Sequence, residues 1–241
     1  MDQIIQAIRE TFRGAGTYLY SDAIYLMNTS DGISKQLLKD YLRDIAPAEL
    51  SVARIDKMTD RLAYVQAEYL ANGKYQRSIV GLIFAEGKWE VVCVTGGSSD
   101  YRFDNLYGKD FQRQIEELSQ IDRILLDYCH SVYHMNAPEC LNLFWEGTRM
   151  YHPNTDDTFT DVEIQVLYER WANMPSPESK GIDEYSRILH VEMLTADTAI
   201  AKIGCAKLEY FYNDYLSLMK LDGSWKIVNK MTQTLHSGNR V

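Results

Sequence analysis

The stretch Asp214-Tyr-Leu-Ser-Leu-Met-Lys-Leu-Asp-Gly-Ser-Trp-Lys-Ile-Val-Asn-Lys230 places two apolar runs on either side of an Asp-Gly pair. Asp-Gly readily adopts the positive φ angles of a tight two-residue turn, so the stretch predicts a β-hairpin. A weaker copy lies at residues 78–94, where Gly87 and Trp89 follow the same order of strand, turn and strand. The two hairpins predict that the chain contains two copies of one structural unit.

The repeat extends beyond the hairpins. Trp89 and Trp225 lie 136 residues apart (225 − 89), and at this offset residues 54–92 align with residues 190–228 without a gap. Alternating apolar residues between turn signals predict four strands in each copy, at 50–58, 61–71, 74–85 and 88–95, and at 185–194, 197–209, 212–221 and 225–234. Each copy therefore ends in an antiparallel meander.

Helices are expected ahead of each meander. In the first copy, apolar residues at helical spacing predict a helix over 4–12, a tyrosine-rich short helix over 17–27, and a helix from 34 to about 44. In the second copy, one apolar stripe runs through Ile121, Ile124, Leu125, Tyr128 and Val132.

Capping signals predict two further helices in the second copy. Asn136 begins one of them, and Thr160 with Glu163 forms a capping box ahead of the other. The predicted class is α+β, with domains at 1–96 and 111–241 joined by a linker at 97–110.

The composition excludes several classes of protein. A formal charge of −9 on 241 residues argues against a nucleic-acid partner, because binding phosphates requires a basic surface. The first residues lack the basic start and apolar core of a signal peptide, and no apolar run reaches the length of a membrane span, so we expect a cytoplasmic protein without a membrane partner. Four cysteines without a CxxC pair predict free buried thiols.

Three segments of the second copy resemble a known family: Ala199-Ile-Ala-Lys202, Asp214-Tyr-Leu-Ser-Leu218 and Asp222-Gly-Ser-Trp-Lys-Ile-Val-Asn-Lys230. They are similar to the putative lumazine-binding family of the nuclear transport factor 2-like superfamily, which includes ketosteroid isomerases and polyketide-cyclase-like proteins. The resemblance covers about residues 118–236. The first copy is divergent, because Ser78-Ile-Val80 stands where the second copy has Asp-Tyr-Leu.

The resemblance implies two tandem cone-shaped domains, each with N-terminal helices packed on a curved antiparallel sheet. It also implies a pocket inside the cone for a small hydrophobic or aromatic molecule, and it implies no particular reaction. Single-domain relatives often dimerise through the convex sheet, so the tandem copies are expected to form an intramolecular pseudo-dimer, with a further homodimer as an open possibility. The pseudo-dimer would be refuted if the separately expressed halves were each soluble, monomeric and as stable as the whole chain.

Asp214 is the first candidate for a catalytic residue, because it begins an apolar strand beside Tyr210 and Tyr212. A carboxylate at an apolar pocket can act as a general base, whereas its structural interpretation is a strand-edge acceptor for a turn. His190 is the second candidate, since it alternates with apolar residues next to Glu192. Its structural interpretation is the polar face of a half-buried strand.

Aromatic residues of the helical part are candidates for the pocket walls. Trp145, Tyr151, Tyr168 and Trp171, together with Tyr210, Tyr212 and Asp214, form the predicted ligand-binding set, although the same aromatics also suit a core. The segment 146–160 has two interpretations, as a lid or as a solvated loop.

Metal and cofactor sites are not expected. His130 and His134 have the spacing of metal ligands, yet both point away from the apolar stripe of their helix. The sequence contains neither a phosphate-binding glycine loop nor a dinucleotide fingerprint. The leading hypothesis is a small-molecule binding protein, with an isomerase, dehydratase or cyclase using Asp214 as base, or a non-catalytic scaffold, as alternatives.

Overall fold

The computed structural model describes residues 1–14, 16–29, 32–45, 47–57, 59–99 and 111–235. The chain folds into two compact units. One contains Met1–Lys109, Pro153–Phe159 and Leu194–Thr198, and the other contains Asp110–His152, Thr160–Met193 and Ala199–Val241. The predicted linker 97–110 falls largely outside the described residues, and its first three residues belong to a strand.

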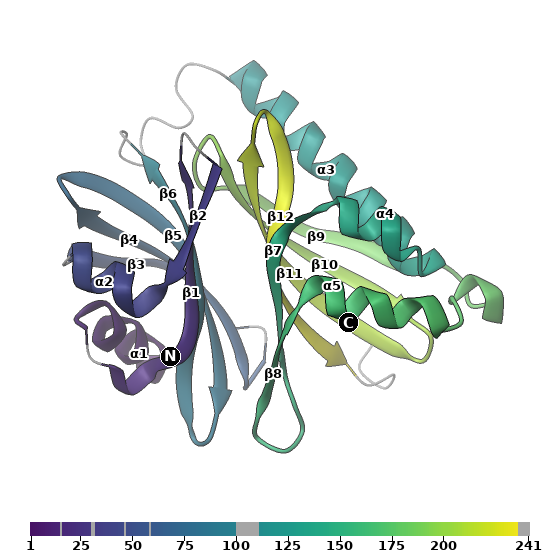
Figure 1. Cartoon of the computed structure of the whole chain (residues 1–241), viewed down its shortest axis with the longest axis horizontal. Helices are drawn as coiled ribbons and strands as arrows, with labels where there is room; N and C mark the ends of the chain where they lie inside the picture. The colour runs from purple at the N-terminus through teal and green to yellow at the C-terminus, as the bar shows by residue number, and fades with distance from the viewer. Residues whose placement is uncertain (15, 30–31, 46, 58, 100–110, 236–241) are drawn as a thin grey trace. The chain divides into compact units, whose positions relative to one another are not determined.

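The first domain is one six-stranded sheet with helices against one of its faces (Figure 1). Its strands lie in the order β2-β1-β6-β5-β4-β3. The elements along the chain are α1 (Asp2–Phe12), β1 (Leu19–Thr29), β2 (Gly32–Leu37), α2 (Leu38–Ile45), β3 (Ala48–Lys57), β4 (Leu62–Ala71), β5 (Lys74–Ala85) and β6 (Lys88–Ser99).

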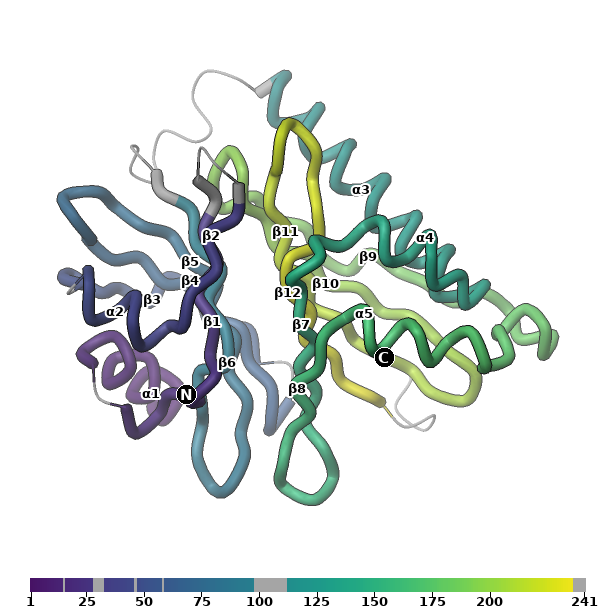
Figure 2. The backbone as a smooth tube through the Cα atoms, in the orientation of Figure 1, coloured from purple at the N-terminus to yellow at the C-terminus, as the bar shows by residue number. Residues whose placement is uncertain are grey.

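The second domain repeats this plan, with strand order β8-β7-β12-β11-β10-β9. Its elements are α3 (Phe111–His134), α4 (Ala137–Asn142), β7 (Phe144–Pro153), β8 (Phe159–Glu163), α5 (Ile164–Glu169), η3 (Arg170–Asn173), η4 (Glu178–Lys180), β9 (Ser186–Met193), β10 (Thr198–Lys207), β11 (Tyr210–Leu221) and β12 (Ser224–Leu235). Helices α3, α4 and α5 lie over one face of this sheet, as the backbone trace shows (Figure 2). The predicted fold class, two tandem α+β domains, is confirmed.

The two meanders form as predicted, and their turns use the expected chemistry. Asp222 and Gly223 have φ angles of 47° and 82°, and Glu86 and Gly87 have φ angles of 51° and 77°. Both central residues of such a turn need positive φ, which Gly and Asp accept at low cost. The four cysteines are free and buried, also as predicted.

Each hairpin contains a β-bulge that the sequence did not reveal. The β11–β12 register shifts between Ser217 and Leu218, and the β5–β6 register shifts between Gly81 and Leu82, which is the same place in the two copies. The shift pairs Asp214 with Thr232. An unbroken register from the Asp222-Gly223 turn would instead pair Asp214 with Met231, so the bulge decides which residues share the face of Asp214.

The structure corrects several predicted elements. Residues 19–27 form most of strand β1 instead of a short helix, after the short 3-10 helix η1 (Gly16–Tyr18), and the helix expected from residue 34 begins only at Leu38, after strand β2. Both sheets are mixed instead of antiparallel, because β1 pairs in parallel with β6 and β7 with β12. Thr160 lies in β8, so the helix cap is Glu163 and no capping box forms. Segment 146–160 is mostly strand, which replaces both the lid and the loop interpretation.

The interior of the first domain is filled by tyrosines. Tyr25 stacks on Tyr41 with ring centroids 3.5 Å apart, and the Tyr69 hydroxyl lies 3.1 Å from that of Tyr41 and 3.2 Å from Ser78 Oγ. Gly96 completes this packing, because a Cβ there would lie 2.6 Å from the Tyr25 hydroxyl. The first domain therefore has side chains where a cone-shaped fold can hold a ligand.

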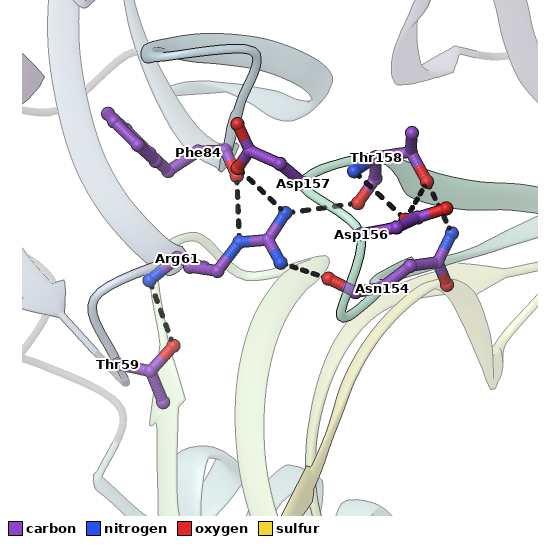
Figure 3. Close-up of polar contacts among 7 residues, drawn as sticks. All are labelled: Thr59, Arg61, Phe84, Asn154, Asp156, Asp157 and Thr158. Carbon is purple, nitrogen blue, oxygen red and sulfur yellow. Dashed lines mark hydrogen bonds and ion pairs between the residues drawn. The ribbon is translucent and has the colours of Figure 1, made fainter.

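Arg61 is a centre of hydrogen bonds within the first compact unit (Figure 3). Its Nε donates to the carbonyl of Phe84 at 3.2 Å, and its other nitrogens donate to the carbonyls of Asn154 and of Thr158. Asp157 adds an ion pair, with Oδ1 3.3 Å from Arg61 Nη2. One guanidinium thus satisfies three backbone acceptors, a role that suits the fixed fork of its donors.

Candidate functional site

The second domain contains a cavity of about 240 Å³ between its sheet and helices. Strand β11 contributes Tyr212 and Asp214, strand β10 contributes Cys205 and Lys207, and η3 contributes Trp171. Tyr128 and Val132 of α3, Met150 and His152 of β7, Leu167 of α5, and Lys230, Thr232 and Thr234 of β12 complete the lining. Ionisable groups from four strands and one helix therefore converge on one space.

Asp214 is at the centre of a buried polar network. It is 1% exposed, and its Oδ2 accepts hydrogen bonds from the Tyr128 hydroxyl at 2.6 Å and from Lys230 Nζ at 2.9 Å. Thr232 Oγ1 donates to Oδ1, and Cys205 Sγ lies 3.7 Å from Oδ2. Because donors surround both carboxylate oxygens, burial of the Asp214 charge is compensated.

Lys230 connects the network to helix α3. Its Nζ donates to the Tyr128 hydroxyl at 2.5 Å as well as to Asp214, and the residue is 6% exposed. Burial, followed by the negative charge of Asp214, raises the pKa of Tyr128 well above its ordinary value. Tyr128 therefore stays a hydroxyl donor at every physiological pH.

Lys207 is the second ammonium group of the cavity, and no carboxylate pairs with it in the part of the chain that the structure describes. The side chain is half-buried, with Nζ 4.8 Å from the centroid of the Trp171 ring. Burial, followed by the positive charge of Lys230, lowers the pKa of Lys207 to about 8. This ammonium is therefore charged at neutral pH but more weakly solvated than a surface lysine.

Tyr212 and His152 supply further polar groups. Burial and then the charge of Asp214 raise the pKa of Tyr212 to about 12, so that its hydroxyl remains a donor. His152 Nδ1 lies 3.1 Å from the carbonyl of Thr232. Because a carbonyl only accepts, Nδ1 carries the proton in this contact.

Three residues of the predicted binding set line the cavity: Asp214, Trp171 and Tyr212. The remaining aromatics do not. Tyr168 is fully buried against Trp171, with ring centroids 4.1 Å apart, and Tyr151 is fully buried on β7. These two are core residues, and they do not line the cavity.

The last three candidates lie away from the cavity. Trp145 is half-buried against Gly147, and Tyr210 is 39% exposed, with its ring 6.4 Å from that of Tyr212. His190 is half-buried on β9, where its Nε2 lies 3.2 Å from Glu192 Oε2. This contact agrees with the structural interpretation of His190 as part of a polar strand face.

Sequence reasoning missed Lys230, Lys207, Tyr128 and Cys205 as members of the site. Lys230 and Thr232 join Asp214 on one face only because of the bulge between Ser217 and Leu218. A signal for Lys207 does exist in the sequence: it follows Ala199, Ala201, Ile203 and Cys205 at a spacing of two, so it continues the apolar inner face of β10.

The offset of 136 residues shows that the first domain lacks this chemistry. Asp214 corresponds to Ser78 (214 − 136), Lys207 to Ala71 and Lys230 to Val94. Cys205 corresponds to Tyr69, whose ring occupies the interior of the first domain. At the positions of Asp214, Lys207 and Lys230, charged side chains are therefore found in the second domain alone.

Comparison with known proteins finds a family match within the second domain. Residues 116–233 match the family described as putative lumazine-binding, which confirms the resemblance found in that half of the sequence. This range contains every residue that lines the cavity except Thr234. A comparison with curated proteins gave no match.

Several solved structures are similar to parts of this chain. A nuclear transport factor 2-like protein of unknown function from Shewanella baltica is 22% identical, with a TM-score of 0.45, over 50% of this chain and 95% of its own. A ketosteroid isomerase-like protein from Erwinia carotovora atroseptica is 17% identical, with a TM-score of 0.40, over 50% and 97%. A protein titled putative scytalone dehydratase from Novosphingobium aromaticivorans is 15% identical, with a TM-score of 0.38, over 54% and 92%.

Among the described residues, no group of three or more His, Cys, Asp or Glu side chains is arranged to hold a metal ion. His134 Nδ1 instead lies 2.7 Å from Glu178 Oε2. Within the same residues, the helices are too short or too polar to cross a membrane.

Proposed function

We propose that the second domain, whose residues 116–233 match the putative lumazine-binding family, binds a small planar molecule in the Asp214 cavity. The observation that carries the proposal is the combination of a partly open cavity with one aromatic wall and a few fixed polar groups. Ligand pockets in proteins have this composition, because apolar walls supply affinity and a few polar groups set orientation.

The size of the cavity limits the ligand to a small molecule. An apolar cavity of about 150 Å³ holds one benzene ring. The cavity here, of about 240 Å³, therefore suits one ring with substituents or two fused rings. Trp171 and Tyr212 provide flat surfaces for such a ligand, and lumazine, which the family description mentions, is a planar molecule of two fused rings.

Catalysis with Asp214 as general base is the second hypothesis, and its location in the cavity favours it. A base must accept a proton from the substrate within hydrogen-bonding distance. Asp214 Oδ2 already accepts from Tyr128 and Lys230. This arrangement supports a structural role for Asp214, as an acceptor of hydrogen bonds within the protein, more than a role as general base in a catalytic cycle.

The remaining proposals concern the chain as a whole. The interior of the first domain is filled by side chains, which supports a structural role for that half. A filled interior is also what the scaffold hypothesis expects. Free cysteines support a reducing compartment, and we retain the cytoplasm as the proposed location. The intramolecular pseudo-dimer stays a prediction from the sequence.

Filling the cavity tests the binding proposal. Leu167 lies on α5 and lines the cavity, so Leu167→Trp places an indole in the ligand space. We expect lumazine or 2-naphthoate to bind the intact protein with one site per chain, and the variant to bind at least about tenfold more weakly, since displacement costs more than 1.4 kcal/mol. Isothermal titration calorimetry measures both affinities.

The matched control is Val166→Trp, on the same helix. Val166 is 40% exposed and does not line the cavity, so this variant should bind as the unmodified protein does. Thermal unfolding of both variants shows whether either has lost its fold. The proposal fails if neither compound binds, or if Leu167→Trp remains folded and binds with unchanged affinity.

A further inference from the structure

The charges around the cavity do not balance. Lys230 and Lys207 each bring an ammonium group, whereas Asp214 is the one carboxylate among the lining residues. Asp214 is engaged with Lys230, whose Nζ lies 2.9 Å from Oδ2. The ammonium of Lys207 is left as a surplus positive charge beside an apolar space.

The surroundings of Lys207 define what could neutralise it. Its known partner among the described residues is the face of the Trp171 ring, 4.8 Å from Nζ. The other titratable groups that line the space come from β7, β10, β11, β12 and α3, and they are His152, Cys205, Tyr212, Asp214, Lys230 and Tyr128. Burial raises the pKa of the Tyr128 and Tyr212 hydroxyls and of the Cys205 thiol, so these three groups remain neutral donors.

A cation that is partly removed from water gains most from a partner of opposite charge. Since the protein supplies none to Lys207 within the described residues, the ligand is the remaining source. We infer that the molecule bound in this cavity is a planar monoanion, whose acidic group pairs with the Lys207 ammonium while its ring system contacts Trp171. This inference rests on the proposed binding function and adds the charge of the ligand to it.

The geometry gives the two lysines different roles. Lys230 is 6% exposed and fixed by Tyr128 and Asp214, so it holds the floor of the cavity together. Lys207 is half-buried near the end of β10 and has no ion-pair partner among the described residues, which suits reversible binding of an anion. Recognition of the anion is therefore assigned to Lys207 alone.

The net charge of the whole chain is negative, whereas the cavity has a surplus positive charge at Lys207. With a formal charge of −9, the protein repels anions at long range. Affinity for an anion must therefore come from local contacts in the cavity, which substitution of one lysine can remove.

A pair of ligands with the same shape and different charge tests the inference. 2-Naphthoate and 2-naphthamide differ in one non-hydrogen atom of the polar group, and the carboxylate stays ionised across the pH range of the test. Calorimetry at pH 7 should give at least about tenfold tighter binding of the naphthoate. The preference should disappear in Lys207→Met, which keeps an unbranched side chain of similar length and removes its charge.

The control lysine lies on the same strand. Lys202 is also half-buried on β10 with its Nζ over an aromatic ring, 5.0 Å from the centroid of Tyr215, but it does not line the cavity. Lys202→Met should retain the full preference for the naphthoate. A preference lost equally in both variants would contradict the assignment to Lys207.

The pH dependence gives a second readout. The Lys207 pKa of about 8 means that its ammonium is present below that value and is lost above it. Affinity for the naphthoate should therefore fall about tenfold between pH 7 and pH 9, while affinity for the naphthamide stays constant. Lys207→Arg should keep the preference and lose the pH dependence, because a guanidinium remains charged at pH 9.

The outcomes separate the two proposals. Equal binding of both compounds would leave the binding function standing and overturn the inference about charge. A preference that survives in Lys207→Met would also overturn it. If neither of these compounds nor lumazine binds the unmodified protein, the proposed binding function itself is contradicted.

Discussion

Replacing Asp214 with alanine is expected to destabilise the second domain by about 3–5 kcal/mol. The variant leaves the ammonium of Lys230 buried without its counter-charge, and it removes the acceptor of Tyr128 and Thr232. A buried charge that loses its partner is among the most costly single changes in a protein. Urea unfolding measures the change in the free energy of unfolding. The signal should come from a probe located in the second domain, since the two domains need not unfold together.

A double variant distinguishes the lost charge pair from general damage. Asp214→Leu combined with Lys230→Met removes both charges and keeps apolar volume, so it should be more stable than Asp214→Ala. Asp60→Ala is the surface control, because Asp60 forms an exposed ion pair with Lys57. It should cause no measurable change. If the free energy of unfolding of Asp214→Ala were within about 1 kcal/mol of that of the unmodified protein, the hydrogen-bond network around Asp214 would not form as described.

Replacing Tyr69 with alanine is expected to destabilise the first domain by about 3–5 kcal/mol. The ring is fully buried, lies 5.0 Å from the ring of Phe12, and occupies the position that Cys205 has in the second domain. Removing it creates a cavity among residues that already form a packed core. The free energy of unfolding of the first domain measures this loss.

Tyr69→Phe separates packing from hydrogen bonding. The phenylalanine keeps the ring but loses the contacts of the hydroxyl with Tyr41 and Ser78. We expect a loss of about 1 kcal/mol, which is typical of a buried hydrogen bond. If the alanine and phenylalanine variants were equally stable, the Tyr69 ring would not fill the interior as described.

Local chemistry explains which strands could be predicted from the sequence. Three turns each place two residues with positive φ between apolar runs: Asn72-Gly73, Glu86-Gly87 and Asp222-Gly223. One strand ends before each turn and the next begins after it. The cap of α4 was equally local, because the Asn136 side chain accepts from the Glu139 amide. Such signals lie within a few residues and need no knowledge of the rest of the fold.

The missed strands depend on distant partners. β1 and β7 each pair in parallel with the last strand of their own sheet, as shown by Tyr25 opposite Val94 and Met150 opposite Lys230. In β1, consecutive residues Ile24, Tyr25 and Leu26 are all buried, which removes the alternation that marks a half-exposed strand. A helix was therefore predicted from a pattern that only the neighbouring strand could resolve.

The candidate site could be predicted only in part for a related reason. Asp214 stood out because the first copy has Ser78 at the same place. Its partners Lys230 and Thr232 depend on a one-residue bulge, and register is not visible in composition. Trp171 and Tyr168 are close in sequence and both belong to the buried core, yet only Trp171 also lines the cavity.

Chemical-shift mapping of the intact protein compares ligand binding by the two domains in a single experiment. The amide spectrum of the intact, isotope-labelled protein is recorded during titration with 2-naphthoate. We predict saturable shifts at Lys207, Tyr212 and Asp214, and none at their counterparts Ala71, Gln76 and Ser78. Equal shifts at both sets of positions, or shifts in the first domain alone, would contradict the claim that only the second domain holds a ligand.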